Sequence, residues 1–445
     1  MLKPVYQKFK PYYKENLALA IPVVISQLGH TLVHTADSVI VGQFAGTIPL
    51  AAVSLVNSIF MVMMVIGIGI SYGLTPLIAQ ENGRNNLNEC NKLLANSLLL
   101  NIIFGFILYG VIYFGSVFAM DHLDQSPAVV AQAKPYMELL GISIIPLMVF
   151  LTFKQFAEGL GFTKQAMMIS IWGNAVNIFF GVIFVKGLFG VHPMGVSGVG
   201  YSTLIDRFLM AVVMTLYIFN SKHFKPYLKN FSFRNIDFSR LTRIFKLGAP
   251  TAMQYTFEVS AFSGAAVLIG TIGAVEQAAH QVAINLAAIT YMMASGVSAA
   301  ATIQSGNNFG KNNFIYLRLS ALSSYHIVLA FMSLTAIIFI TCNQYLPMFY
   351  SKDAAVIQIA ASLLLIAAVF QLFDGAQVVG LGILRGLGDV NIPTFITFTA
   401  YWLVGLPVGY LMGIKLGYGV NGIWYGLCLG LLVASILLFY RFQKL

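Results

Sequence analysis

Three carboxylates lie inside long apolar segments, where a charged group is costly. Asp37, Glu258 and Asp374 have apolar residues on both sides, whereas most other acidic residues are near segment ends or in loops. A charge at the centre of a bilayer costs about 2.5–3.5 kcal/mol on insertion scales, so such a group usually faces a polar cavity and has a task. We expect these carboxylates to bind a cation or a proton; the alternative is hydrogen bonding between helices.

Neutral polar residues accompany these acids at helical spacing, so that they share a helix face with them or form a similar pair on another helix. Oxygen ligands of this kind suit a hard cation such as Na⁺, with Glu258 and Asp374 as its candidate ligands. The same carboxylates could instead carry a proton, because burial disfavours the charged form. The sequence leaves both open. The expected supporting residues are Gln254, Tyr255, Gln371, Asn174, Asn177 and His34.

Two other patterns suggest chemistry that the rest of the chain does not support. His30 and His34 are one helical turn apart, but the pattern identifies no third zinc ligand. GNNFGKNN at residues 306–313 resembles a phosphate-binding loop, yet it has three residues between its glycines and Asn312 after its lysine. A true loop has four residues there and a Ser or Thr. We therefore expect an ion gradient, and not ATP, to supply the energy.

Composition places these residues in a polytopic membrane protein. Of 445 residues, 58% are apolar and 9% are charged, and the mean hydropathy is +0.81. Crossing a bilayer takes about 20 apolar residues in a helix. The apolar runs are continuous and do not alternate as barrel strands do, so the expected fold is all-α. The twelve predicted spans cover residues 16–42, 47–75, 92–118, 128–151, 164–187, 194–220, 244–271, 277–304, 316–346, 354–383, 392–414 and 419–441.

The two halves of the chain repeat each other. Pro22 matches Pro250 at an offset of 228 residues, and AQENGRNN at residues 79–86 matches GNNFGKNN at residues 306–313 at an offset of 227. Duplication on this scale is typical of secondary transporters, in which two similar bundles face one cleft.

We predict two six-helix lobes, residues 1–220 and 244–445, joined by a basic cytoplasmic connector at residues 221–243. Six is an even number, so the pseudo-two-fold axis runs along the membrane normal. With both termini cytoplasmic, 20 of the 25 basic residues lie on the cytoplasmic side, as the positive-inside rule requires. They follow the membrane boundary and do not cluster on one face, so we expect contact with membrane lipids and none with nucleic acid.

Four stretches resemble the multidrug and toxic compound extrusion (MATE) transporters, over nearly the whole chain. They are AIPVVISQLGHTLVHTADSVIVGQFAG, GAPTAMQYTFEVSAF, AAHQVAINLAAITYMMASGVSAAATIQSGNNFGKNN and FDGAQVVGLGILRGLGD. The resemblance is closest to the bacterial NorM-like branch, because Asp37, Glu258 and Asp374 fall at its acidic positions in the first, seventh and tenth spans. It implies coupling-ion binding by the second-half acids and a first-lobe cavity site at Asp37 with Asn177. Phe370 departs from members with a tyrosine there, so it offers no oxygen to a cation.

The resemblance and the residues together predict a secondary active antiporter and not an enzyme. It would export cationic or aromatic amphipathic drugs in exchange for Na⁺ or H⁺ by alternating access, as a monomer in the inner (cytoplasmic) membrane. We expect no cofactor besides the coupling ion. The alternative is a lipid-linked oligosaccharide flippase of similar architecture, which would line its cleft with more basic residues to bind a pyrophosphate. A membrane enzyme would need clustered catalytic groups, such as a DxxxD pair, and the sequence has none.

Overall fold

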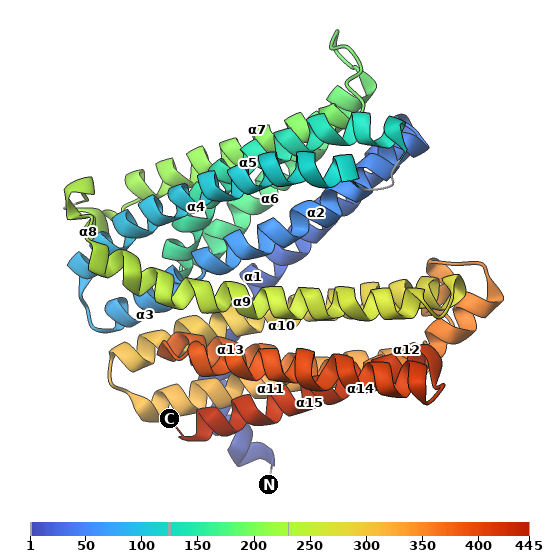
Figure 1. The fold of residues 1–445 in the computed structure, drawn as a ribbon. Coiled ribbons are helices and arrows are strands. Elements are labelled where there is room, and N and C mark those ends of the chain that lie inside the picture. Colours follow the sequence, from blue (N-terminus) through green and yellow to red (C-terminus); the bar gives the residue numbers. More distant parts are fainter. Residues whose placement is uncertain (1, 123–125, 230, 445) are drawn as a thin grey trace. The chain divides into compact units, whose positions relative to one another are not determined.

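The computed structural model describes the backbone of residues 2–122, 126–229 and 231–444, whose regular structure is entirely helical (Figure 1). The first half and the connector contain α1 (Leu2–Phe44), α2 (Thr47–Ser71), α3 (Leu74–Gly83), α4 (Leu87–His122), α5 (Pro127–Gly159), α6 (Thr163–Lys186), α7 (Val196–Asn220), α8 (Lys225–Leu228) and the 3₁₀ turn η1 (Phe233–Asn235). The second half contains α9 (Phe238–Gly270), α10 (Ala274–Gly310), α11 (Phe314–Thr341), the 3₁₀ turn η2 (Leu346–Phe349), α12 (Ala354–Leu387), α13 (Asn391–Phe398), the π-helix η3 (Thr399–Gly405), α14 (Leu406–Tyr410), the π-helix η4 (Leu411–Lys415) and α15 (Gly419–Lys444).

The predicted all-α membrane architecture is confirmed. Within the described residues, eleven helical segments are long and apolar enough to cross a membrane. Two of them combine several elements: α2 continues into α3, and α13 continues through η4. The seventh predicted span, residues 244–271, corresponds to α9, which is 33 residues long but is not among the eleven. Its glutamine, glutamate and hydroxyl side chains lower its hydropathy, so twelve spanning helices remain consistent with the structure.

Contacts divide the chain into two compact units that differ from the predicted lobes at two places. One unit comprises Met1–Val24 with Met253–Leu445, and the other comprises Ile25–Ala252. Both boundaries follow, by two residues, the paired prolines Pro22 and Pro250. The start of each half therefore groups with the helices of the other half, which contiguous lobes at residues 1–220 and 244–445 do not capture.

Side-chain contacts explain the grouping of these start segments. In the unit that contains the second half, Asn16 of α1 is fully buried and its Nδ2 lies 3.0 Å from the Ser324 hydroxyl of α11. In the other unit, the end of α2 packs directly on the start of α9. A Cβ atom added to Gly73 would collide with the backbone of Ile244 and Gly248. Tertiary contacts between residues distant in sequence fix these positions, and a local pattern does not reveal them.

Glycines let α15 approach the preceding span until their backbones touch. A Cβ atom on Gly426 would collide with backbone atoms of Gly409 and Gly405. Small residues four apart allow this close packing, which replaces the hydrophobic driving force that is absent within a membrane. The three glycines of α15, with the glycines that face them in antiparallel order, are Gly422, Gly426 and Gly430 with Gly413, Gly409 and Gly405.

Gly426→Ala should therefore destabilise the protein. The added methyl group has no room, and overpacking of this kind typically costs about 1–3 kcal/mol. We expect a lower melting temperature and a smaller monodisperse fraction after detergent extraction, measured by fluorescence-detected size exclusion. Gly110→Ala is the matched control, because open space surrounds a Cβ atom there. Equal behaviour of the two variants would contradict the packing argument.

Candidate functional site

The second-half acids lie close together in one unit. Glu258 is in α9 and Asp374 is in α12, and they are 6% and 4% exposed. Their charges interact, and Tyr291 of α10 donates a hydrogen bond to Glu258. Asp374 Oδ1 is buried and has no hydrogen-bond partner in the described part of the chain. Two neighbouring buried carboxylates, one with an open acceptor, favour a bound cation or a shared proton.

The glutamines that flank Asp374 point to different neighbours. Gln371 Oε1 accepts a hydrogen bond from Thr335 Oγ1 of α11 at 3.0 Å, and Gln377 Oε1 accepts one from Tyr401 Oη of η3 at 3.0 Å. Residues three apart on a helix are rotated by about 60° from each other, so three such residues fan across a wide sector. Both amide oxygens already hold a donor, which leaves Asp374 as the more available oxygen ligand.

Phe370 confirms the expected lack of a cation ligand one turn before Asp374. Its ring is 2% exposed and packs against Phe262 and Trp424, with ring centroids 6.0 and 5.4 Å away. An apolar wall therefore closes this side of the acid pair.

Gln254 and Tyr255 lie on α9 near the turn that follows α12. Gln254 Nε2 donates to Thr394 Oγ1 at 3.0 Å and to the Val390 carbonyl at 3.2 Å. The Arg385 guanidinium lies 5.6 Å from the centre of the Tyr255 ring. These contacts hold α9 and α12 together next to the acid pair, and whether Gln254 and Tyr255 also serve ion binding stays a prediction.

Two residues of this cluster, Tyr291 and Arg385, are absent from the sequence-based candidates. Arg385 lies at the end of an apolar run, where the charge pattern groups it with the cytoplasmic basic residues, yet it is only 7% exposed and its charge interacts with Glu258. Its spacing from Asp374 is the available signal, because eleven residues make about three helical turns and return to the same face. Tyr291 has no such signal, since it is on a third helix.

Tyr291→Phe should slow transport without unfolding the protein. The variant removes the hydroxyl that donates to Glu258, and a hydrogen bond to a charged group is worth about 1.5–3 kcal/mol. We expect the initial rate of ethidium accumulation in everted vesicles to fall about tenfold at equal expression. Tyr345→Phe, at a tyrosine that is 65% exposed, is the control. A rate equal to that of the control would show that the hydroxyl does not matter.

The first-half acid Asp37 lies in a second buried cluster, within the other unit. Asp37 of α1 is 3% exposed, and Asp206 and Arg207 of α7 are 4% and 6% exposed. Arg207 Nη1 donates to Ser143 Oγ of α5 at 2.7 Å, and its charge interacts with both acids. Asp37 Oδ1 and Asp206 Oδ1 have no hydrogen-bond partner among the described residues.

The predicted supporting residues of Asp37 are only partly described. Asn177 is fully buried and its Nδ2 donates to Thr203 Oγ1 at 3.1 Å, while its Oδ1 has no partner in the described part of the chain. Asn174 is 8% exposed, and its amide lies against Gly29 of α1. His34 lies within helix α1, but its side chain is outside the described residues.

Both clusters have the same charge balance on different positions. Each contains two carboxylates and one guanidinium, so full ionisation leaves an excess of one negative charge. The members are Glu258, Asp374 and Arg385 in one unit and Asp37, Asp206 and Arg207 in the other. An uncompensated charge in a membrane interior is unfavourable, so each cluster is suited to one additional cation or proton.

Comparison with known proteins begins with a family model. The MatE model matches residues 22–183 and again residues 250–411. The two matches start 228 residues apart and end 228 residues apart, which confirms the internal repeat and its offset.

Full-length relatives and solved structures agree with this match. The chain is 33% identical to the multidrug resistance protein MdtK of Yersinia pseudotuberculosis over 445 residues, covering 99% of this chain and 97% of the relative. The Yersinia enterocolitica protein of the same name is 33% identical over 443 residues, with the same coverage. Among solved structures, the eukaryotic MATE transporter AtDTX14 has a TM-score of 0.89 at 18% identity, covering 98% of this chain and 96% of its own. The Vibrio cholerae MATE transporter VcmN in the bent form has a TM-score of 0.88 at 18% identity and 98% coverage of both chains.

Proposed function

We propose, from the premise that this chain belongs to the MatE family of membrane transporters, that it is a secondary active antiporter. It exports cationic or aromatic amphipathic compounds in exchange for Na⁺ or H⁺. The observation that carries the proposal is the pair of buried clusters, each with one carboxylate more than its guanidinium neutralises. The relatives named multidrug resistance protein support drug efflux as the process.

Competition for negative charge couples the ion to the drug. A cation or proton that binds at Glu258 and Asp374 removes the field that attracts a cationic compound. Because each ligand then weakens the binding of the other, the ion entering from outside favours release of the drug outward. Alternating access requires that the site open to one side of the membrane at a time. The membrane potential contributes about 2.3 kcal/mol per charge per 100 mV to this exchange.

The two coupling ions make different demands on the cluster. Sodium takes several oxygen ligands, and Asp374 Oδ1 is open while the flanking glutamine oxygens already accept hydrogen bonds. A proton needs only one carboxylate oxygen. The structure therefore suits a proton at least as well as sodium, and separate gradients distinguish the two.

The charge balance favours drug export over lipid flipping. A flippase for a pyrophosphate-linked lipid would need an excess of positive charge to bind its substrate, whereas both clusters have an excess of negative charge. We place the protein in the inner membrane, as a monomer with both termini cytoplasmic and with its basic residues at anionic lipid headgroups. The distribution of those residues supports this orientation.

Everted vesicles test the proposal. Ethidium accumulation would be followed by fluorescence after a Na⁺ gradient or a pH gradient is imposed alone, with vesicles that lack the protein as the reference. We expect one of the two gradients to drive accumulation, and that gradient identifies the ion. Accumulation that depends on neither gradient would refute antiport.

A further inference from the structure

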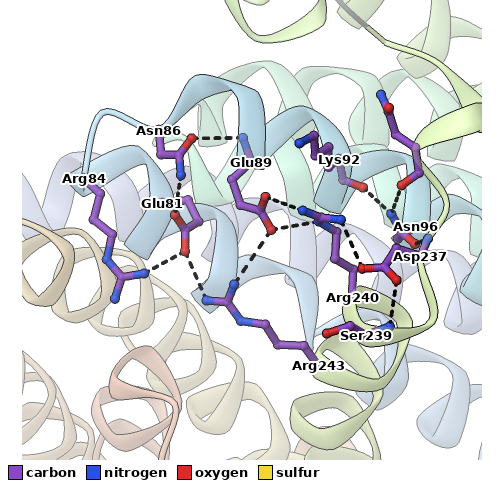
Figure 2. A network of polar contacts seen from close by, with 11 residues as sticks. Glu81, Arg84, Asn86, Glu89, Lys92, Asn96, Asp237, Ser239, Arg240 and Arg243 are labelled. Carbon is purple, nitrogen blue, oxygen red and sulfur yellow. Dashed lines mark hydrogen bonds and ion pairs between the residues drawn. The ribbon is translucent and has the colours of Figure 1, made fainter.

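A polar network ties the start of α9 to the first half of the chain, entirely within the unit Ile25–Ala252 (Figure 2). Arg240, in the first turn of α9, makes a bidentate contact with Glu89 of α4: its Nε is 2.9 Å from Oε1 and its Nη2 is 3.0 Å from Oε2. Bidentate pairs fix geometry as well as charge. Both side chains are partly buried, at 24% and 17% exposed, so water screens this pair less than a surface pair.

The second arginine of α9 reaches a buried carboxylate. Arg243 Nη2 lies 3.1 Å from Glu81 Oε1, and the Glu81 side chain is only 4% exposed. Arg84 contacts the same oxygen at 2.7 Å, and Asn86 Nδ2 lies 3.3 Å from the other oxygen. Figure 2 shows that Glu81 and Glu89 lie side by side, facing the two arginines. A buried carboxylate needs such partners, and removing one leaves a charge that is poorly compensated.

The connector itself is fixed next to this network. Asn96 of α4 is fully buried, and its side chain accepts from the Asp237 backbone N–H at 2.8 Å and donates to the Asn235 carbonyl at 3.0 Å. Asp237 in turn contacts Arg240 at 3.1 Å. The hydrogen bond to Glu89 raises the pKa of Arg240, so the arginine stays charged at any physiological pH. The network therefore responds to charge substitution and not to physiological changes in pH.

The equivalent positions of the other half use aromatic contacts. At the repeat offsets, Arg240 corresponds to Tyr12, Arg243 to Glu15 and Glu89 to Tyr316. Within the unit that contains them, the rings of Tyr12 and Tyr316 are 4.5 Å apart, and Tyr316 Oη donates to Glu15 at 2.6 Å. The docking of a start segment on the other half is thus common to both repeats. The ionic form, with two acids facing two arginines, occurs at one of them.

We propose that Glu81, Glu89, Arg240 and Arg243 form an ionic latch that positions α9, and through it Glu258, for transport. The four are positioning residues and contact neither ion nor drug. Arg243 and Glu258 are on the same helix, 15 residues or about 22 Å apart along its axis. Release of the first turns of α9 from the latch lets the helix shift, so the latch controls the turnover rate and leaves substrate affinity unchanged. This role in transport rests on the proposed antiport.

Charge exchange between Arg240 and Glu89 tests the latch. Glu89→Arg and Arg240→Glu each place like charges together, and each should lower the maximal rate of ethidium accumulation about tenfold with an unchanged KM. The double variant restores a pair of opposite charges, with its acid now on α9 one turn from Arg243. It should therefore recover to within about twofold of the wild-type rate. Arg234→Glu, an exposed arginine in the same connector, is the control and should have no effect.

Hydrogen exchange separates the latch from the proposed antiport. In each purified variant, amide exchange over residues 231–245 should accelerate in the single variants and return to the wild-type rate in the double variant. This readout applies even if the wild-type protein transports no ethidium, an outcome that would refute the antiport alone. Where a charge reversal does not fold, Glu89→Gln and Arg240→Gln replace it, with the same direction of change. Single variants with unchanged exchange, or a double variant that recovers neither exchange nor rate, would overturn the latch.

Discussion

Glu258→Gln is expected to abolish most gradient-driven transport while the protein remains folded. Glutamine keeps the size of the side chain and its ability to accept from Tyr291, but it neither binds a proton nor attracts a cation. An interaction with a charged group is worth about 1.5–3 kcal/mol, so the initial rate of ethidium accumulation should fall about 10- to 100-fold. The loss should appear as a lower maximal rate, because the ion no longer binds to this cluster.

Glu138→Gln is the matched control for this variant. Glu138 of α5 is exposed, so its neutralisation should leave the transport rate unchanged. Asp374→Asn should resemble Glu258→Gln, because the two acids belong to one cluster and titrate together. Full activity of both cluster variants would exclude the second-half cluster as the coupling site.

The membrane architecture follows from the sequence because it depends on composition summed over long segments. Each helix must satisfy its own backbone and expose about 20 apolar residues, and both requirements are visible along the chain. The repeat is visible for a similar reason, since Pro22 and Pro250 keep their spacing of 228. The exception is α9, where a functional glutamate and its polar neighbours lower the apolar signal of the segment that positions them.

The position of the start segments could not be predicted in this way. Asn16 is buried against α11, and Arg240 pairs with Glu89, which lies 151 positions earlier in the chain. A basic connector reads as a solvated cytoplasmic loop, and periodicity does not show that two of its arginines face carboxylates. Contacts between residues far apart in sequence determine these details, and one sequence does not encode them locally.

The candidate site shows the same division between what is local and what is not. Burial of Asp37, Glu258 and Asp374 could be predicted, because each acid interrupts an apolar run. Their guanidinium partners, Arg207 and Arg385, could not, because each lies on another helix or several turns away. The amide oxygens of Gln371 and Gln377 share a helix with Asp374, yet hydroxyls on two different elements hold them.

The repeat conserves the charge balance of the clusters without conserving their positions. At the offset of 228, Asp37 corresponds to Ala265, which is fully buried in an apolar core, and Glu258 corresponds to His30. Each half has nevertheless acquired two acids and one arginine. Independent placement of the same charge balance suits two sites with separate tasks, one for the coupling ion and one for the drug.

Asp37→Asn tests this division of tasks and should weaken drug binding while coupling is retained. The variant leaves Asp206 with Arg207, a neutral pair that no longer attracts a cationic compound. Loss of one favourable charge interaction of about 1.4 kcal/mol would raise the KM for ethidium about tenfold, with the dependence on the driving gradient unchanged. Asp353→Asn is the control, because Asp353 is exposed and caps α12, where asparagine is an equally good cap. If Asp37→Asn instead removes the dependence on the gradient while Glu258→Gln retains it, the first-half cluster binds the ion and the assignment of the two clusters is reversed.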